Sequence, residues 1–323
     1  MKMNVSKPLA AISLDLDNLW SYMRTHGDPG WEEYPSYLDT FIPKVLGLLK
    51  QLDLKITFFI VGKDAALGKN KKHLAQLTAE GHEVANHSFL HDQWINSYSR
   101  ERIRREIADA ENAITEVTGQ KPIGFRGPGY CINRFLYEVL VDLGYLYDTS
   151  SLPTFLGPLA RAYYFKTAVL DDIEKKKRKE LFGDFENGMK PVKPYFCQAD
   201  TGKLLLEIPV TTIPILKIPF HLSYLIYIAR YSEEVMRYYL NFAILSCMIS
   251  RTPLNFLLHP LDLIGREDAP GLVFFPGMDM TGKRKTRIFL GVLRTLAKHY
   301  HLVSMGVFAK HILQQENIKV VRN

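Results

Sequence analysis

The segment KITFFIVG at residues 55–62 decides the fold. A dense run of β-branched and aromatic residues that ends at a glycine predicts a buried strand. Further along the chain, His73–Glu80 has the pattern of a short helix that ends at Gly81, and Glu83–His87 predicts the next strand. A strand, a helix and a second strand in this order are typical of a mostly parallel α/β fold.

The same alternation extends outward in both directions. The further strands that it predicts are Leu9–Leu16, Ile123–Arg126, Tyr145–Asp148, Leu204–Pro209, Asn255–His259 and His301–Ser304. The further helices are Leu38–Leu52, Ser99–Val117, Arg134–Leu143, Ser232–Ser250 and Thr286–Tyr300. Ser99 suits an N-cap, and Gly119 lies just beyond the end of the same helix. Six or seven strand–helix units in about 300 residues predict a (β/α) barrel with an open or irregular seam.

The alternation breaks between about residues 153 and 203. Several prolines punctuate this stretch, which also contains the basic run EKKKRKE at residues 174–180. We interpret the stretch as an insertion on the barrel rim, because it offers no second apolar pattern that would form a core. Residues 1–323 are therefore expected to form a single domain.

Composition narrows the class of protein. Of the 323 residues, 47% are hydrophobic and 23% charged, which excludes a disordered chain and a disulfide-stapled mini-protein. The net charge of +7 suits an anionic surface or substrate, and no nucleic-acid partner is expected at this modest charge. The three cysteines contain no CxxC pair, which favours a reducing compartment.

The sequence predicts neither a signal peptide nor a transmembrane helix. The apolar run after the N-terminal lysines is interrupted by Asp15, which makes it too short for a signal-peptide core. Nowhere do 18 apolar residues follow one another, so no conventional transmembrane helix is predicted. A cytoplasmic location is the expectation.

Polar residues of catalytic type follow five of the predicted strands. In barrels of parallel strands, functional side chains gather at the carboxyl ends of the strands. The residues at these ends are Asp15, Asp17, His87, His91, Arg126, Asp148 and His259. Folding alone gives little reason for such a set, so this edge is the predicted site.

The pair His87 and His91 is a candidate metal-binding motif. In an extended chain the two rings would lie roughly 13 Å apart, too far to share an ion. If the chain turns helical after His87, the rings stack about 6 Å apart along the axis and both reach one ion. With an aspartate from a neighbouring strand, two nitrogens and one carboxylate leave a position open for water, as in catalytic sites.

Asp15 and Asp17 are two residues apart, so they share one face of an extended strand. One carboxylate can then bind the ion while the other accepts a proton from water. The alternative is that one of them only caps the turn at Asp17–Asn18.

Six segments carry a resemblance to a known family. In chain order they are AISLDLDN, KITFFIVG, GHEVANHSFLH, GFRGPGY, LGYLYDTSSLP and FLLHP. The chain resembles the polysaccharide deacetylase (NodB-homology) family of metal-dependent carbohydrate esterases, over residues 10–148 and again over 204–263. The resemblance implies a distorted (β/α) barrel, usually of seven strands. It also implies a hydrolase of carbon–nitrogen amide bonds that removes the acetyl group of an N-acetylated sugar, usually with Zn²⁺.

The resemblance also implies a role for each site residue. Asp17, His87 and His91 match the metal ligands, for which Co²⁺ or Ni²⁺ are alternatives to zinc. Asp15 matches the catalytic base and Arg126 the residue that orients it. His259 matches the general acid and Asp148 the residue that orients it. Leu257 lines the acetate pocket, and an amide near Gly129 or Tyr130 stabilises the oxyanion.

Three features depart from the family pattern. Leu16 separates the two aspartates, Gly129 stands between the proline and Tyr130, and no tryptophan follows Asp148 at the usual spacing. None of them removes a metal ligand.

Alternatives stay open. A deformylase or an amidase of a non-sugar amide shares the reaction class. A glycosyltransferase with a metal-binding DxD would leave His87, His91 and His259 without a function. A carbohydrate-binding relative would keep the fold without turnover. Asp262 is interpreted as a cap of the turn that follows His259. The other histidines are interpreted as surface or core residues: His26, His73, His82, His221, His299, His301 and His311.

The segment 213–231 is apolar and aromatic and is interrupted by Pro214 and Pro219. One interpretation is a strand and a core helix. The other is an interfacial segment that, together with 174–180, holds the protein against the inner leaflet of a membrane. The second interpretation suggests a lipid-linked, acetylated or formylated amino sugar as the substrate, met in a bacterial glycan pathway before export.

Overall fold

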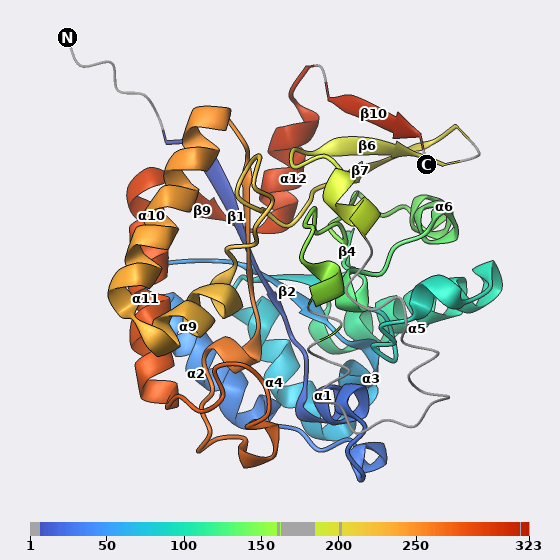
Figure 1. The fold of residues 1–323 in the computed structure, drawn as a ribbon. Coiled ribbons are helices and arrows are strands. Elements are labelled where there is room, and N and C mark those ends of the chain that lie inside the picture. The colour runs from blue at the N-terminus through green and yellow to red at the C-terminus, as the bar shows by residue number, and fades with distance from the viewer. Residues whose placement is uncertain (1–6, 160–161, 163–184, 200–201, 317, 323) are drawn as a thin grey trace.

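The computed structural model describes residues 7–159, 162, 185–199, 202–316 and 318–322 (Figure 1). The basic run 174–180 and much of the predicted insertion lie outside the described residues. In the described part of the chain, no helix is long and apolar enough to cross a membrane. The three cysteines are buried, and none of them forms a disulfide.

The predicted distorted barrel is confirmed. Seven parallel strands of the described chain pair in the order β7-β5-β4-β3-β2-β1-β8. They are β1 Leu9–Asp15, β2 Thr57–Ile60, β3 Glu83–Asn86, β4 Gly124–Phe125, β5 Tyr147–Asp148, β7 Leu204–Glu207 and β8 Leu254–Leu258. Each lies within or overlaps a strand that the sequence predicts.

The seam between β7 and β8 is irregular, as expected. The Thr211 amide donates to the Asn255 carbonyl at 3.1 Å. The Asn255 side-chain amide donates to the carbonyls of Ile208 and Pro209, both at 3.2 Å. A buried asparagine therefore joins the two strands where a regular ladder is absent.

Helices form the outer layer (Figure 1). They are α2 Leu38–Gln51, α4 Gly68–Ala79, α5 Arg100–Thr118, α6 Arg134–Asp142, α9 Leu222–Tyr231, α10 Glu233–Ser250 and α11 Gly282–His299. On β1, Ile12 and Leu14 point outward into this core, whereas Ser13 points inward and contacts Arg126. As predicted, Ser99 caps α5 through the Arg102 amide, and Gly119 ends it with φ of 69°.

The sequence pattern did not predict several elements that the structure contains. They are α1 Leu19–His26, α3 Gly62–Ala66, α12 Met305–Leu313, β6 Tyr195–Gln198 and β10 Lys319–Arg322, together with six 3-10 turns at Trp31–Glu33, Ile95–Ser97, Pro128–Tyr130, Phe185–Met189, Pro260–Asp262 and Pro270–Leu272. β6 runs antiparallel to β7, and β10 pairs with β6 at the edge of the sheet. The predicted last strand, β9 (His301–Val303), pairs with the start of β1.

Helix α12 fills the end of the barrel at which the strands begin. Its residues Met305 and Phe308 pack against interior side chains of the strands. The amide of Met305 donates to Thr57 Oγ1 at 2.7 Å, and that of Gly306 donates to Glu83 Oε2 at 2.7 Å. Since a helix N-terminus favours a negative partner, Glu83 anchors α12 beneath the strands. The carboxyl ends of the strands are left as the open end.

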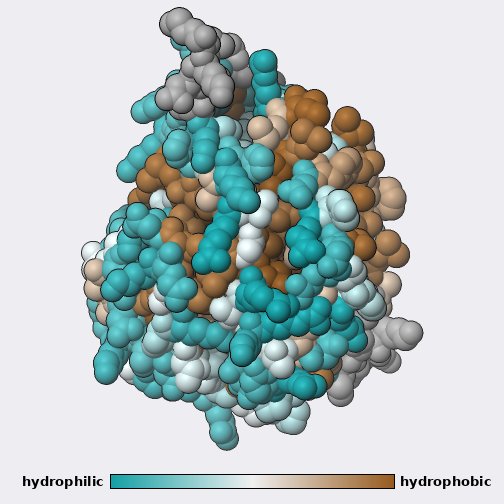
Figure 2. Space-filling view, turned by 90° about the vertical axis from the view of Figure 1, so that its left-hand side faces the viewer, coloured by the Kyte–Doolittle hydropathy of each residue, from teal (hydrophilic) through white to brown (hydrophobic). Residues whose placement is uncertain are grey.

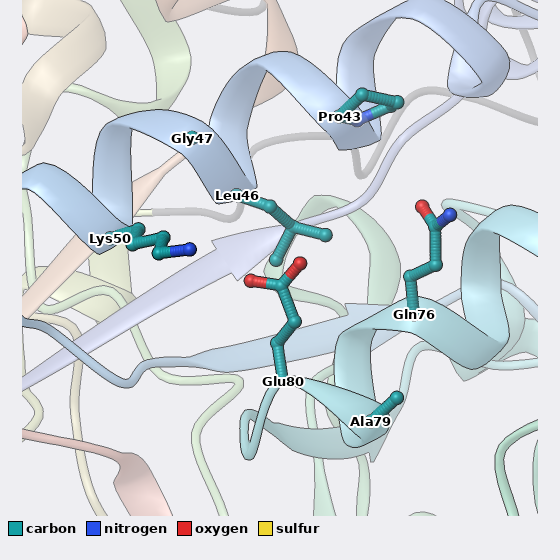
Figure 3. Close-up of a pocket in the computed structure, with 7 residues that line it drawn as sticks. All are labelled: Pro43, Leu46, Gly47, Lys50, Gln76, Ala79 and Glu80. Carbon is teal, nitrogen blue, oxygen red and sulfur yellow. The ribbon is translucent and has the colours of Figure 1, made fainter.

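A hollow on the outside of the barrel lies between α2 and α4 (Figure 3). It is lined by Pro43, Leu46, Gly47, Lys50, Gln76, Ala79 and Glu80. Lys50 and Glu80 lie at the C-terminal ends of their helices, hence toward the end of the barrel where the strands begin. The hollow contains none of the predicted site residues.

Gly62 shows how tightly the helices approach the strands. A Cβ at this position would lie 2.6 Å from Ala110 Cα and 2.7 Å from the Phe89 ring. Gly62→Ala should therefore lower the free energy of unfolding by about 2 kcal/mol, because the backbone of α5 must move. Gly47→Ala is the matched control, since a Cβ there meets nothing within 4 Å. Urea unfolding of both variants tests this; equal stabilities would contradict it.

We expect the stability of the protein to depend on pH through His82. Burial lowers the pKa of this imidazole from 6.5 to about 4, and Nδ1 accepts the Ile56 amide at 3.2 Å. As the pH falls, the imidazole takes up a proton near pH 6.5 in the unfolded chain. In the folded chain it takes up this proton only near pH 4. His82 should thus contribute stability above pH 6.5 and lose about 3 kcal/mol of it as the pH falls to 4. Urea unfolding at several pH values should show a smaller slope in His82→Asn; an unchanged slope would refute the assignment.

Candidate metal centre and catalytic site

The Asp17 carboxylate is available as a metal ligand because its neighbour Asn18 caps helix α1. The Asn18 side chain accepts the Leu19 amide at 2.8 Å and begins α1. The Asp17 carbonyl accepts the Tyr37 hydroxyl at 2.5 Å, which fixes the backbone at the end of β1. The interpretation of Asp17 as a turn cap is therefore wrong, and its carboxylate points toward the histidines instead.

The segment from His87 to His91 is not the helical turn that the spacing suggested. Ser88 and His91 have φ of 61° and 54°, so two left-handed residues bend the loop. The amides of residues 89 and 90 donate to Glu106 Oε2 at 3.2 and 2.9 Å. The Gly62 amide donates to the Ser88 carbonyl at 2.9 Å. This loop brings the two imidazoles together, with ring centroids 4.9 Å apart, without a helix.

Asp17, His87 and His91 form a group that could hold a metal ion. Asp17 Oδ1 lies 2.9 Å from His91 Nε2 and 3.4 Å from His87 Nε2, and all three residues are buried. His87 Nδ1 lies 2.6 Å from the Arg126 carbonyl, which assigns its proton to Nδ1 and leaves Nε2 with its lone pair toward Asp17. Two imidazoles and one carboxylate suit a divalent cation such as zinc. The donor set therefore fits the group that the sequence predicted.

The electrostatics of the cluster favour a charged carboxylate. Burial alone would raise the pKa of Asp17, but the adjacent imidazoles of His91 and His87 outweigh burial and hold this pKa well below its ordinary value. For His87, burial acts to lower the pKa, and the carboxylates of Asp15 and Asp17 raise it overall. Asp17 is thus an ionised, buried acceptor, as a metal ligand must be.

Asp15 is held by one oxygen and open at the other. Arg126 Nη1 donates to Asp15 Oδ1 at 2.6 Å. Arg126 itself is fully buried and is fixed by Ser13 Oγ at 3.0 Å and by the Thr149 carbonyl at 3.2 Å. Asp15 Oδ2 lies 4.0 Å from His87 Nε2 and 3.9 Å from His259 Nε2. The second oxygen thus stands between the metal group and the predicted acid.

His259 has different partners from those predicted. Its Nδ1 lies 3.0 Å from Ser223 Oγ and 3.9 Å from Asp262 Oδ2. Asp262 also accepts the His259 amide at 2.8 Å, so the predicted cap is present as well. Burial raises the pKa of the Asp262 carboxyl. In this structure Asp262, rather than Asp148, is the carboxyl near Nδ1 of His259.

Asp148 faces another carboxyl group instead. Asp148 and Glu207 are paired in register on β5 and β7, and both are fully buried. Asp148 Oδ1 accepts the Ser150 hydroxyl at 2.6 Å, and Glu207 Oε1 accepts the Ser151 amide at 2.9 Å. Burial raises the pKa of both groups. Two neighbouring buried carboxyls repel each other when both are charged, which favours the protonated form of one of them. The predicted contact of Asp148 with His259 is therefore corrected.

The substrate-side residues lie at the ends of β4 and β8. Leu257 is buried and pairs in register with Ser13, on the interior face of the barrel. Gly129 and Tyr130 both have φ of 61° in a turn after β4. The Tyr130 amide donates to the Gly127 carbonyl at 3.1 Å, so this amide is already engaged. Of the two amides predicted to bind the oxyanion, that of Gly129 is the better candidate.

His221 was missed among the ordinary histidines. It is buried at the start of α9, and its ring centroid lies 5.8 Å from that of His259. Burial, followed by the nearby His259 and Arg126, holds its pKa well below 6.5. Its position just before Ser223, the contact of His259, is the only signal that the sequence contains. No spacing to another ligand marks it.

Comparisons with known proteins match part of this chain. Residues 28–147 match the polysaccharide deacetylase family. The peptidoglycan-N-acetylglucosamine deacetylase of Bacillus cereus is 34% identical over 106 residues, which cover 33% of this chain and 48% of that protein. The chitin deacetylase of Colletotrichum lindemuthianum is 30% identical over 118 residues, covering 36% and 47%. The chain thus spans about half the length of these curated relatives.

A solved structure extends the likeness to the whole fold. A candidate polysaccharide deacetylase from Mycobacterium smegmatis superposes with a TM-score of 0.61 at 17% identity, and the match covers 100% of this chain and 96% of that one. At this identity the likeness concerns the fold alone. The family match contains His87, His91 and Arg126, and Asp15, Asp17 and His259 close around them. The resemblance in the sequence motifs is confirmed over residues 28–147, which match the polysaccharide deacetylase family.

Proposed function

We propose that the protein is a metal-dependent N-deacetylase that hydrolyses the N-acetyl group of an amino sugar. The observation that carries this proposal is the arrangement of two carboxylates. Asp17 Oδ1 lies between the two metal-site imidazoles, while Asp15 Oδ2 stays open between His87 and His259. Asp17 would bind the ion, and Asp15 would accept the proton.

A divalent ion at Asp17, His87 and His91, most simply Zn²⁺, would supply polarisation of the amide carbonyl and a more acidic water. The chain's own groups do the rest. Asp15 Oδ2 accepts a proton from the attacking water, whose oxygen bonds to the carbonyl carbon. Arg126 keeps the other Asp15 oxygen in place at 2.6 Å. The Gly129 amide donates to the oxyanion as it develops.

His259 completes the reaction on the other side. Its Nε2 lies 3.9 Å from Asp15 Oδ2, so acid and base flank the same space. The His259 imidazolium donates a proton to the amide nitrogen as the carbon–nitrogen bond breaks, releasing acetate and the free amine. Ser223 and Asp262 hold its Nδ1 and its amide, which makes them positioning residues. Leu257 contacts the methyl group of the leaving acetate.

The substrate in this proposal is a bacterial surface glycan or its lipid-linked precursor. The peptidoglycan and chitin deacetylases among the relatives support an N-acetylglucosamine unit. A cytoplasmic protein at the inner membrane would meet the precursor before export. In the segment 213–231, Phe220 and Leu225 are buried in the core, whereas Ile215 is 92% exposed. A membrane contact of this segment would thus involve its turn at Ile215 and the exposed end of α9 at Tyr231.

The test is mass spectrometry of candidate substrates incubated with zinc-loaded protein. Acetylated oligomers of glucosamine, peptidoglycan fragments and lipid-linked amino sugars are offered side by side. The loss of one acetyl group from an amino sugar supports the proposal. Loss of a formyl group only would make the protein a deformylase. Metal binding and glycan binding without loss of either group would make it a non-catalytic carbohydrate-binding relative.

A further inference from the structure

Helix α10 has apolar residues on two faces. Met236, Leu240 and Ile244 pack into the core, as expected for one face of a helix on a barrel. The opposite face is also apolar and is exposed, at alternating intervals of three and four residues: Val235, Tyr238, Phe242, Leu245 and Ile249. Tyr238 and Ile249 are 77% and 76% exposed. A continuous stripe of this kind marks a surface that contacts something else.

A basic stripe lies beside the apolar one. Helix α11 contains no acidic residue, and its outward side chains include Lys283, Arg287, Arg294 and Lys298. Glu233, at the start of α10, lies 3.1 Å from Arg284 and 2.6 Å from Arg287, which joins the two helices at their N-terminal ends. The two helices are neighbours on one side of the barrel (Figure 1).

The two stripes run in the same direction. α10 leads into β8 and α11 into β9, and both strands are parallel to β1. From Glu233 to Ile249 a helix rises about 24 Å, and from Arg287 to Lys298 about 17 Å. The most apolar turns, Phe242–Ile249, therefore lie level with Arg294 and Lys298. Figure 2 views this side of the molecule and shows apolar side chains gathered next to hydrophilic ones.

We propose that this α10–α11 face is a docking surface for a bilayer with anionic headgroups. The apolar stripe of α10 enters the boundary between headgroups and acyl chains, and the cations of α11 contact the headgroup phosphates. Tyrosine at the start of the stripe suits the same depth, because its ring is apolar and its hydroxyl is polar. The surface is made of residues outside 213–231, and docking does not depend on the proposed catalysis.

Charge favours a lipid surface over a second copy of this chain. A two-fold pairing through α10 would bring two acid-free α11 helices to the rim of one interface, where their cations repel. Anionic headgroups would neutralise the same cations. The stripe also lacks a charged residue from Tyr238 to Ser250, which a bilayer boundary favours.

Co-sedimentation with vesicles tests the proposal on the full chain. Vesicles of phosphatidylglycerol and phosphatidylcholine are compared with vesicles of phosphatidylcholine alone, at low and at high salt. Wild type should bind the anionic vesicles more tightly, and salt should weaken binding. Ile249→Glu should reduce binding at least about tenfold, and Arg294→Glu with Lys298→Glu by a similar factor.

Val320→Glu is the matched control. Val320 is 47% exposed on β10, at the edge of the sheet away from β1 and β8. The substitution introduces the same charge as Ile249→Glu on another surface and should leave vesicle binding unchanged. Circular dichroism and acetate release from a soluble substrate should be the same in all variants, because none of these residues contacts the site.

Three results would overturn the proposal. One is binding that is equal for both vesicle types, and another is binding that none of the α10–α11 variants weakens. The third is a concentration-dependent dimer in sedimentation velocity that Ile249→Glu dissociates, with no vesicle binding. That result would assign the face to self-association. Failure of deacetylation alone leaves the docking measurement untouched, so the two proposals fail separately.

Discussion

His87→Ala is expected to empty the metal centre and to lower acetate release by about 10³-fold or more. The imidazole supplies one of three donor atoms, so its loss leaves only Asp17 and His91. Polarisation of the carbonyl by an ion contributes several kcal/mol to the transition state, which sets the size of the effect. Metal content measured by elemental mass spectrometry after dialysis checks the binding, and acetate release checks the rate.

A surface histidine provides the control for this experiment. His311→Ala, on the exposed face of α12, should keep both the metal and the activity. Circular dichroism of His87→Ala should match that of wild type, because a small side chain in the loop leaves the strands intact. If His87→Ala kept a full complement of metal, the assignment of the three ligands would be wrong.

Asp15→Asn is expected to separate the base from the ion. The amide keeps the shape of the side chain and its contact with Arg126, but it cannot accept a proton. Loss of a general base costs about 10²- to 10⁴-fold in rate. The metal content should stay close to that of wild type, because Asp17 Oδ1 is the oxygen that lies against His87 and His91. Elemental analysis and acetate release on the same sample test both statements.

Asp109→Asn, on the exposed face of α5, is the matched change. It should alter neither quantity. A loss of metal in Asp15→Asn would mean that Asp15 is itself a ligand and that the two aspartates exchange roles. Full activity in Asp15→Asn would remove the base from the mechanism.

The sequence predicted the barrel strands well because each one is a short, buried apolar run with a clear end. β2, for example, is the centre of KITFFIV, and all four of its residues are buried. Elements held by distant partners were not visible. β10 pairs with β6, and α12 is held by Thr57 and Glu83, so neither depends on a local pattern alone.

The sequence predicted which residues form the site more accurately than it predicted the contacts between them. Asp17, His87 and His91 come together as expected, yet the loop between the histidines uses left-handed backbone at Ser88 and His91 rather than a helix. Spacing alone cannot distinguish these two ways of bringing rings together. The partner of His259 also depends on how α9 packs, which places Ser223 beside it.

The pairing of β1 has a consequence for the order in which the chain folds. β1 is made early, yet its neighbours include β8 and β9, with Leu9 opposite His301. Contacts between such distant parts of a chain form slowly, so β1 can pair with β2 first and completes its pairing only after β8 and β9 have been made. The ligand-bearing segments are all synthesised by residue 91, whereas the acid arrives at residue 259. During translation, we expect metal affinity to appear before the chain is competent for turnover.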